Sequence, residues 1–164
     1  MTLASRPLHP SPAASGPPPH GFAAGRIGFP RAAWRAMPGA MKPRRTKIYF
    51  DGGCRPNPGA MEIAVVIGGV AAIDRAAGTG SSMDAEWLAL IAALRLAQAR
   101  GLSDFVLLGD AAVVVAQANG AVAARHGAAA HLAVFRGLVG DGPAPRVRHV
   151  KRSQNLAGIA LARR

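Results

Sequence analysis

The chain has 164 residues, half of them apolar, which is enough for one domain with a buried core. Its one cysteine excludes an internal disulfide and fits a reducing compartment, and no apolar run reaches the ~18 residues of a membrane-spanning helix. A formal net charge of +12 points to a polyanionic partner. We therefore expect a cytoplasmic, monomeric protein with no membrane contact.

The N-terminal stretch differs in composition from the rest of the chain. Residues 1–50 hold eight Lys and Arg and no acidic residue, and they are rich in Pro, Ala, Ser and Gly. Because they lack helical or strand periodicity, we expect a disordered basic tail over residues 1–45 and a folded domain over residues 46–164. Three interpretations of this stretch remain open: a tail or over-extended start before a true beginning at Met41, a basic arm with salt-sensitive affinity for nucleic acid, or an organelle transit peptide, which so many prolines disfavour.

The first part of the domain reads as three strands joined by turns. Lys47–Phe50 predicts a short strand, and Asp51 ends it at the start of the segment D-G-G-C-R-P-N-P-G. Glycines allow positive φ angles and prolines remove amide donors, so the backbone is expected to leave the sheet directly after Asp51. Ala60–Gly68 and Val70–Ala76 follow with short glycine-containing connections, which predicts an antiparallel meander.

A long helix is predicted next. Ser81 and Ser82 offer N-caps, and Asp84 and Glu86 place negative charge in the first turn, where it stabilises the helix dipole. The helix is expected to end at Arg100-Gly101. Its apolar residues at helical spacing are Trp87, Leu90, Ile91 and Leu94.

The second half of the chain alternates strands and helices. The predicted elements are a strand over Phe105–Gly109 that ends in Asp110, helices over Ala111–Ala118 and His131–Val139, a strand over Arg146–Val150 and a helix over Asn155–Ala162. The order β-β-β-α-β-α-α-β-α predicts an α/β fold. We expect a mixed five-stranded sheet, with three antiparallel strands followed by two parallel ones, flanked by helices.

Three acidic residues stand at the ends of predicted elements. Asp51 and Asp110 follow strands, and Glu86 lies in the first turn of the long helix. Carboxylates at parallel strand ends face the crevice where α/β folds bind ligands, and convergent carboxylates suit a hard divalent cation such as Mg²⁺. Taken singly, each acid is better explained without a metal: Glu86 as a partner of the helix dipole, and Asp51 and Asp110 as caps or solvated strand ends.

Four segments occur in order along residues 46–164 and form a family pattern. They are the strand with D-G-G-C-R-P-N-P-G, then S-S-M-D-A-E-W-L-A-L from Ser81 to Leu90, then L-L-G-D from Leu107 to Asp110 with A-A-V-V-V-A-Q after it, and finally R-S-Q-N-L-A-G-I-A-L-A from Arg152 to Ala162. On these segments the chain resembles the type 1 ribonuclease H family. The resemblance implies a ribonuclease H-like fold for residues 46–164.

The resemblance also implies an activity and a metal site. The implied enzyme is an endonuclease that hydrolyses the RNA strand of RNA·DNA hybrids with two Mg²⁺ or Mn²⁺ ions. By motif, Asp51, Glu86 and Asp110 would be the catalytic metal ligands, with Asp51 bridging both ions.

Substrate contacts are implied by the same motifs. The backbone of Gly53 and Cys54 and the side chain of Asn57 would lie along the minor groove, where 2′-hydroxyls distinguish RNA from DNA. The other implied substrate-binding residues are Ser82, Gln117 and Asn155.

The chain departs from the family pattern at its last helix. The family's fourth carboxylate falls on Ile159, or on Gly158 in a register slipped by one residue, and neither can bind a metal. The paired asparagines expected before the glutamate are Ser82 and Met83. Two hypotheses therefore stay open: a hybrid ribonuclease slowed by the loss of one metal ligand, or a non-catalytic ribonuclease H-like module that binds hybrid or structured RNA.

Basic residues gather near the last predicted strand. They could neutralise phosphates, or they could form a solvated edge that discourages aggregation. His131 and His149 are candidates for the family's mobile catalytic histidine, but their spacing gives no support for that role. The basic residues are Arg146, Arg148, Lys151 and Arg152.

Overall fold

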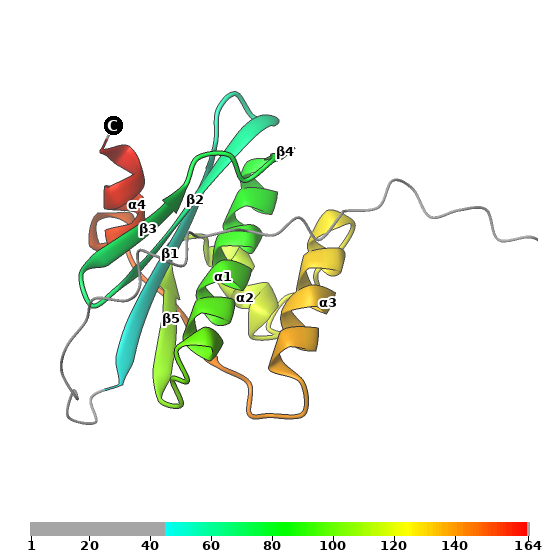
Figure 1. Cartoon of the computed structure of the whole chain (residues 1–164). Helices are drawn as coiled ribbons and strands as arrows, with labels where there is room; N and C mark the ends of the chain where they lie inside the picture. Colours follow the sequence, from blue (N-terminus) through cyan, green and yellow to red (C-terminus); the bar gives the residue numbers. More distant parts are fainter. Residues whose placement is uncertain (1–44, 164) are drawn as a thin grey trace, which may run out of the picture.

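The computed structural model of the protein describes residues 45–163. The expected disordered tail over residues 1–45 lies outside the described residues, apart from Arg45. Within them, a mixed β-sheet lies between helices (Figure 1). Its strands, in order across the sheet, are β3 (Val70–Asp74), β2 (Gly59–Ile67), β1 (Thr46–Cys54), β5 (Phe105–Gly109) and β6 (Arg146–His149), and the short β4 (Thr79–Gly80) pairs with β2.

The strand directions follow the predicted topology. β1 and β2 pair in antiparallel fashion, as do β2 and β3, whereas β5 runs parallel to both β1 and β6. The mixed α/β fold is therefore confirmed, but the expected count of five strands was too low, because the sheet of the described residues has six. The additional strand, β4, pairs only Gly59 with Gly80 and Ala60 with Thr79, and two residues carry no periodicity to detect.

The first strand is longer than expected. Asp51 does not end β1: it pairs with Ala64 of β2, and the strand continues through Cys54. The Gly-Gly pair that suggested a turn instead allows a helix to approach the sheet. A Cβ atom on Gly52 would lie 2.2 Å from the backbone carbonyl carbon of Ala85, so only glycine fits at this position.

Four α-helices complete the described fold: α1 (Ser82–Ala99), α2 (Ala112–Ala118), α3 (Gly127–Val139) and α4 (Leu156–Ala162), with a 3-10 turn, η2 (Arg152–Gln154), before the last. Of the two predicted N-caps, Ser81 caps α1, and it also forms a capping box with Asp84. α3 begins four residues before the predicted start at His131, because G-A-A-A carries neither a capping residue nor an apolar pattern.

The helices cover the two faces of the sheet unequally (Figure 1). α1, α2 and α3 lie on one face, where Trp87 packs with Ile48, Phe50 and Leu107 in the main core. α4 lies on the other face, where Leu161 packs with a smaller cluster that Tyr49 borders. Among residues 45–163, no helix combines the length and apolarity needed to cross a lipid bilayer.

Candidate metal centre

Three carboxylates meet where β1, β5 and α1 converge. Asp51 and Asp110 each lie two residues beyond the paired Tyr49 and Leu108, so the parallel register brings them side by side. Glu86 reaches them from the second turn of α1 rather than from the predicted first turn, and α1 packs closely on β1 at Gly52. One oxygen from each of the three carboxylates lies within 4.8 Å of the others.

Burial and like charge make this cluster electrostatically unfavourable without a cation. Burial, followed by a hydrogen bond with Asp110 and its charge, raises the pKa of Asp51 to about 7. Burial, followed by the charges of Asp51 and Asp110, raises the pKa of Glu86 to about 8. Oε2 of Glu86 is buried and has no hydrogen-bond partner among the described residues. The three acids therefore fit a hard divalent cation, which takes oxygen ligands and would occupy the orphaned oxygen.

Asn155 holds two of the carboxylates in place. Its Nδ2 atom donates to Oδ1 of Asp110 at 2.6 Å and to the carbonyl of Phe50 at 2.9 Å, and lies 3.4 Å from Oδ1 of Asp51. Its Oδ1 atom accepts from the backbone N–H of Ala157 and so caps α4. The side chain is fully buried, so Asn155 contacts the acids from the protein interior rather than from the surface.

The last helix brings no carboxylate to the centre. A Cβ atom on Gly158 would lie 3.3 Å from Cγ of Asp51. The backbone of α4 therefore approaches this acid closely at Gly158, with no side chain between them. Ile159 follows directly, and the sequence of α4, L-A-G-I-A-L-A, contains no acidic residue. Both positions that the family pattern offers for a fourth acid are thus apolar.

One arginine contributes positive charge at the rim. Nη1 of Arg152 lies 3.4 Å from Oδ2 of Asp110, and the arginine side chain is 75% exposed. Its charge lowers the pKa of Asp51 and of Glu86, against the larger effects of burial and of the neighbouring acids. The sequence placed Arg152 in a basic cluster but gave no sign of this ion pair, which depends on the turn η2.

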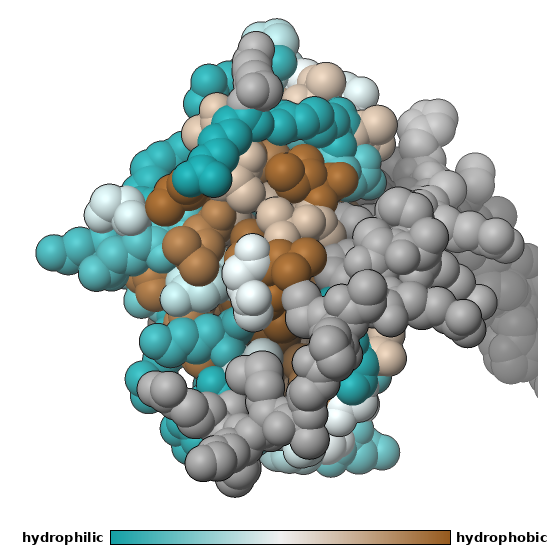
Figure 2. Space-filling model, turned by 60° about the vertical axis from the view of Figure 1, so that its left-hand side comes forward, coloured by the Kyte–Doolittle hydropathy of each residue, from teal (hydrophilic) through white to brown (hydrophobic). Residues whose placement is uncertain are grey.

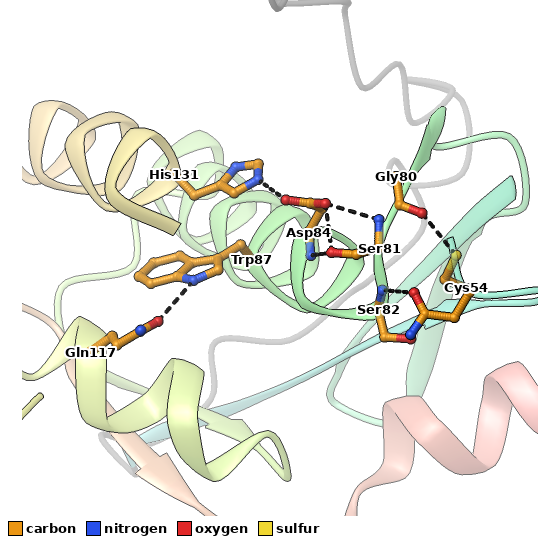
Figure 3. Close-up of polar contacts among 9 residues, drawn as sticks. Cys54, Gly80, Ser81, Ser82, Asp84, Trp87, Gln117 and His131 are labelled. Carbon is orange, nitrogen blue, oxygen red and sulfur yellow. Dashed lines mark hydrogen bonds and ion pairs between the residues drawn. The ribbon is translucent and has the colours of Figure 1, made fainter. Parts of the chain in front are cut away.

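The turn after β1 is tied to the start of α1 (Figure 3). The backbone N–H of Ser82 donates to Oδ1 of Asn57 at 3.0 Å, so these two predicted substrate contacts lie together. The thiol of Cys54 is buried and donates to the carbonyls of Pro56 and Gly80, at 3.0 and 3.1 Å. Gly53 precedes it in β1, with Glu62 beside its Cα.

Gln117 is buried on α2 and points toward α1 (Figure 3). Its Oε1 atom accepts from Nε1 of Trp87 at 3.3 Å. It also lines a depression of about 430 Å³ together with Ser81 and Met83, at the beginning of α1. Gln117 therefore borders a hollow whose lining includes none of the three acids.

The two histidines occupy different environments. His131 is buried, lies with Nε2 2.9 Å from Oδ1 of Asp84, and stacks on Trp87 with ring centroids 6.4 Å apart (Figure 3). These contacts account for His131 as a packing residue between α3 and α1. His149 is exposed at the end of β6.

Comparison with known proteins gives a consistent family signal. A family model described as reverse transcriptase-like matches residues 49–164. No curated protein matches the chain at a significant level.

Several solved structures resemble the chain. RNase H1 from the halophilic archaeon Halobacterium salinarum is 31% identical, with a TM-score of 0.63, over 72% of this chain and 94% of that one. LC11-RNase H1, isolated from compost by a metagenomic approach and solved with an RNA/DNA hybrid, is 28% identical, with a TM-score of 0.61, over 67% of this chain and 88% of that one. The N-terminal RNase H domain of a Mycobacterium tuberculosis protein is 26% identical, with a TM-score of 0.60, over 71% of this chain and 92% of that one.

Proposed function

The chain belongs to the ribonuclease H-like family, and from that premise we propose that it is a metal-dependent endonuclease that hydrolyses the RNA strand of RNA·DNA hybrids. The observation that carries the proposal is the group of three carboxylates within 4.8 Å, two of them with strongly raised pKa values. Such a cluster is costly to maintain unless a cation or a chemical step uses it. LC11-RNase H1, which binds an RNA/DNA hybrid, supports the same substrate class here.

Asp51, Glu86 and Asp110 would hold Mg²⁺ or Mn²⁺ at this centre. When bound, two such ions supply Lewis-acid stabilisation of the phosphate and a water of lowered pKa. By the family pattern, Asp51 would be the ligand that both ions share. Asn155 acts as a positioning residue, because its amide fixes one oxygen of Asp110 and lies against Asp51.

The substrate would lie across the turn after β1 and the start of α1. Asn57 and Ser82 are held together there, and the backbone of Gly53 and Cys54 leads from this turn to Asp51. Polar backbone and small side chains suit the minor groove of a hybrid, where 2′-hydroxyls identify the RNA strand. Gln117 would contact the substrate only from the adjoining hollow.

A second candidate function is a non-catalytic module that binds hybrid or structured RNA. The observation that favours it is that α4 lies against Asp51 at Gly158 and contains no acidic residue, which leaves the centre without a fourth carboxylate. Loss of one ligand would slow the reaction, since each ~1.4 kcal/mol of barrier is a factor of ten in rate. The proposed enzyme is therefore expected to be slow relative to a four-carboxylate centre.

Cleavage of a labelled hybrid tests the two candidates directly. The 164-residue chain and its Asp51→Asn variant would each be incubated with an RNA·DNA hybrid carrying a label on the RNA, in Mg²⁺, Mn²⁺ or EDTA. We expect metal-dependent cleavage of the RNA strand by the wild type and none by the variant. A DNA duplex of the same sequence serves as the control substrate. Equal inertness of both proteins, with the hybrid still bound, would favour the non-catalytic module.

A further inference from the structure

A basic groove lies on the part of the sheet that α4 leaves uncovered. We call it the sheet groove; its volume is about 530 Å³, and it spans β1, β5 and β6. Figure 2, turned so that the left-hand side of Figure 1 comes forward, shows apolar residues at the surface between hydrophilic ones. The residues that define the sheet groove are Arg45, Lys47, Tyr49, Val106, Leu108 and Arg148.

Its rim is positively charged. No acidic residue lines the groove within the described part of the chain. Arg45 forms an ion pair of 2.8 Å with Asp104, whereas Lys47 and Arg148 are exposed and have no acidic partner among residues 45–163. The charge of the groove therefore complements a polyanion.

Its floor is apolar and aromatic. Val106 and Leu108 of β5 are each only 7% exposed, so the half-buried ring of Tyr49 of β1 offers most of the accessible apolar surface. Grooves that bind single-stranded nucleic acid combine such a floor, on which bases pack, with cations that neutralise the backbone. A duplex presents only phosphates and sugars to a surface of this kind, so the floor favours unpaired bases.

The groove lies on the same strands as two of the carboxylates of the candidate metal centre. Side chains alternate along a strand, so Lys47, Tyr49 and Asp51 share one face of β1, and Leu108 shares a face of β5 with Asp110. At about 3.3 Å per residue, Tyr49 lies roughly 7 Å from Asp51 along the strand, and Lys47 roughly 13 Å. Gln154, which lines the groove, directly precedes Asn155, which contacts the carboxylates, so the groove and the centre are adjacent.

We propose that the sheet groove binds an unpaired, single-stranded extension of the nucleic acid held at the metal centre. The inference rests on the proposed function and extends its substrate from a plain hybrid to a hybrid with a single-stranded overhang. The chain's own N-terminal stretch is a poor occupant, because residues 1–44 hold six Lys and Arg and no acid. Its positive charge repels that of the groove.

Binding measurements in a cleavage-deficient background test the proposal. Every protein would carry Asp51→Asn in the full chain, and fluorescence anisotropy would follow three labelled ligands: a blunt hybrid, the same hybrid with an unpaired extension, and the single strand alone. Two groove variants would be made: a double variant with Lys47→Ala and Arg148→Ala, and a single variant with Tyr49→Ala. Tyr49→Phe is the conservative control for the second. Arg136→Ala, an exposed cation on α3, is the matched charge control.

We expect the extension to tighten binding of the hybrid, and the groove variants to remove that gain without affecting the blunt hybrid. The double variant should weaken binding of the single strand about fivefold or more. It should also reduce the magnitude of the slope of the log binding constant against log salt concentration by about 1.4, because it removes two cations and each phosphate contact contributes about 0.7. Tyr49→Ala should weaken binding about fivefold or more with little change in the slope, while Tyr49→Phe should not. Arg136→Ala should leave the gain from the extension intact.

The outcomes separate this proposal from the proposed function. The groove assignment would be overturned if the extension did not increase the affinity for the hybrid, or if the groove variants kept that increase. Binding of the blunt hybrid would remain in either case. A second outcome is that the protein binds the single strand but not the blunt hybrid, and that the groove variants abolish this binding. That result would support the groove and count against the hybrid as substrate. If no ligand binds, both proposals are lost.

Discussion

Replacing Glu86 by glutamine should stabilise the metal-free protein at alkaline pH and leave its stability near pH 4.5 almost unchanged. The folded state raises the pKa of Glu86 from its ordinary value of 4.5 to about 8, so it holds a proton that the unfolded chain has lost. The stability linked to this proton is fully present below pH 4.5 and is lost as the pH rises through about 8. The loss amounts to a few kcal/mol, at about 1.4 kcal/mol for each tenfold change in proton affinity.

Glutamine cannot ionise, so the variant avoids this loss. We expect the variant to exceed the wild type by at least about 2 kcal/mol at pH 9 in EDTA, which for a domain of this size corresponds to a rise in Tm of roughly 6 to 10 °C. Urea unfolding followed by circular dichroism, at pH 4.5 and pH 9, measures the difference. Asp141→Asn, which removes one exposed charge from a loop, controls for the change in net charge. Equal gains at both pH values, or none at pH 9, would refute the raised pKa assigned to Glu86.

Three further predictions follow from the same centre. Mg²⁺ should raise the Tm of the wild type more at pH 8 than at pH 5, because the cation binds the ionised acids, and differential scanning calorimetry with and without Mg²⁺ at the two pH values checks this. Asn155→Ala should destabilise the fold by about 2 to 4 kcal/mol in urea unfolding, because it removes the cap of α4 and leaves buried partners unsatisfied. Ile159→Asp should raise the rate of hybrid cleavage by restoring a carboxylate, whereas Gly158→Asp should not, because its Cβ would lie 3.3 Å from Cγ of Asp51. Unchanged cleavage by Ile159→Asp would show that the missing acid is not the defect.

The sequence predicts elements best where local signals agree with tertiary packing. β5 occupies the predicted residues Phe105–Gly109, and α1 starts and ends within one residue of its prediction, because a capping serine and an apolar pattern both mark it. The extent of β1 could not be predicted in the same way. Gly52 and Gly53 read locally as a turn, but pairing with β2 and close packing of α1 hold them extended.

The candidate site shows the same division. That Asp51, Glu86 and Asp110 would converge could be inferred from their positions at element ends and from the family pattern, although Asp51 proved to lie within its strand. The contacts of Asn155 could not be inferred, because they join residues 45 and 104 positions apart in the sequence. Such contacts depend on the register of β1 with β5 and on the docking of α4, which no local pattern specifies.

The buried thiol of Cys54 gives the molecule a built-in reporter. It is the only cysteine in the chain, and it is enclosed between the carbonyls of Pro56 and Gly80, under the turn that carries Asn57. A thiol-reactive reagent can reach it only when this turn separates from the residues before α1. The rate of alkylation therefore measures how often the turn opens, without any added label, and a ligand that rests on the turn should slow that rate.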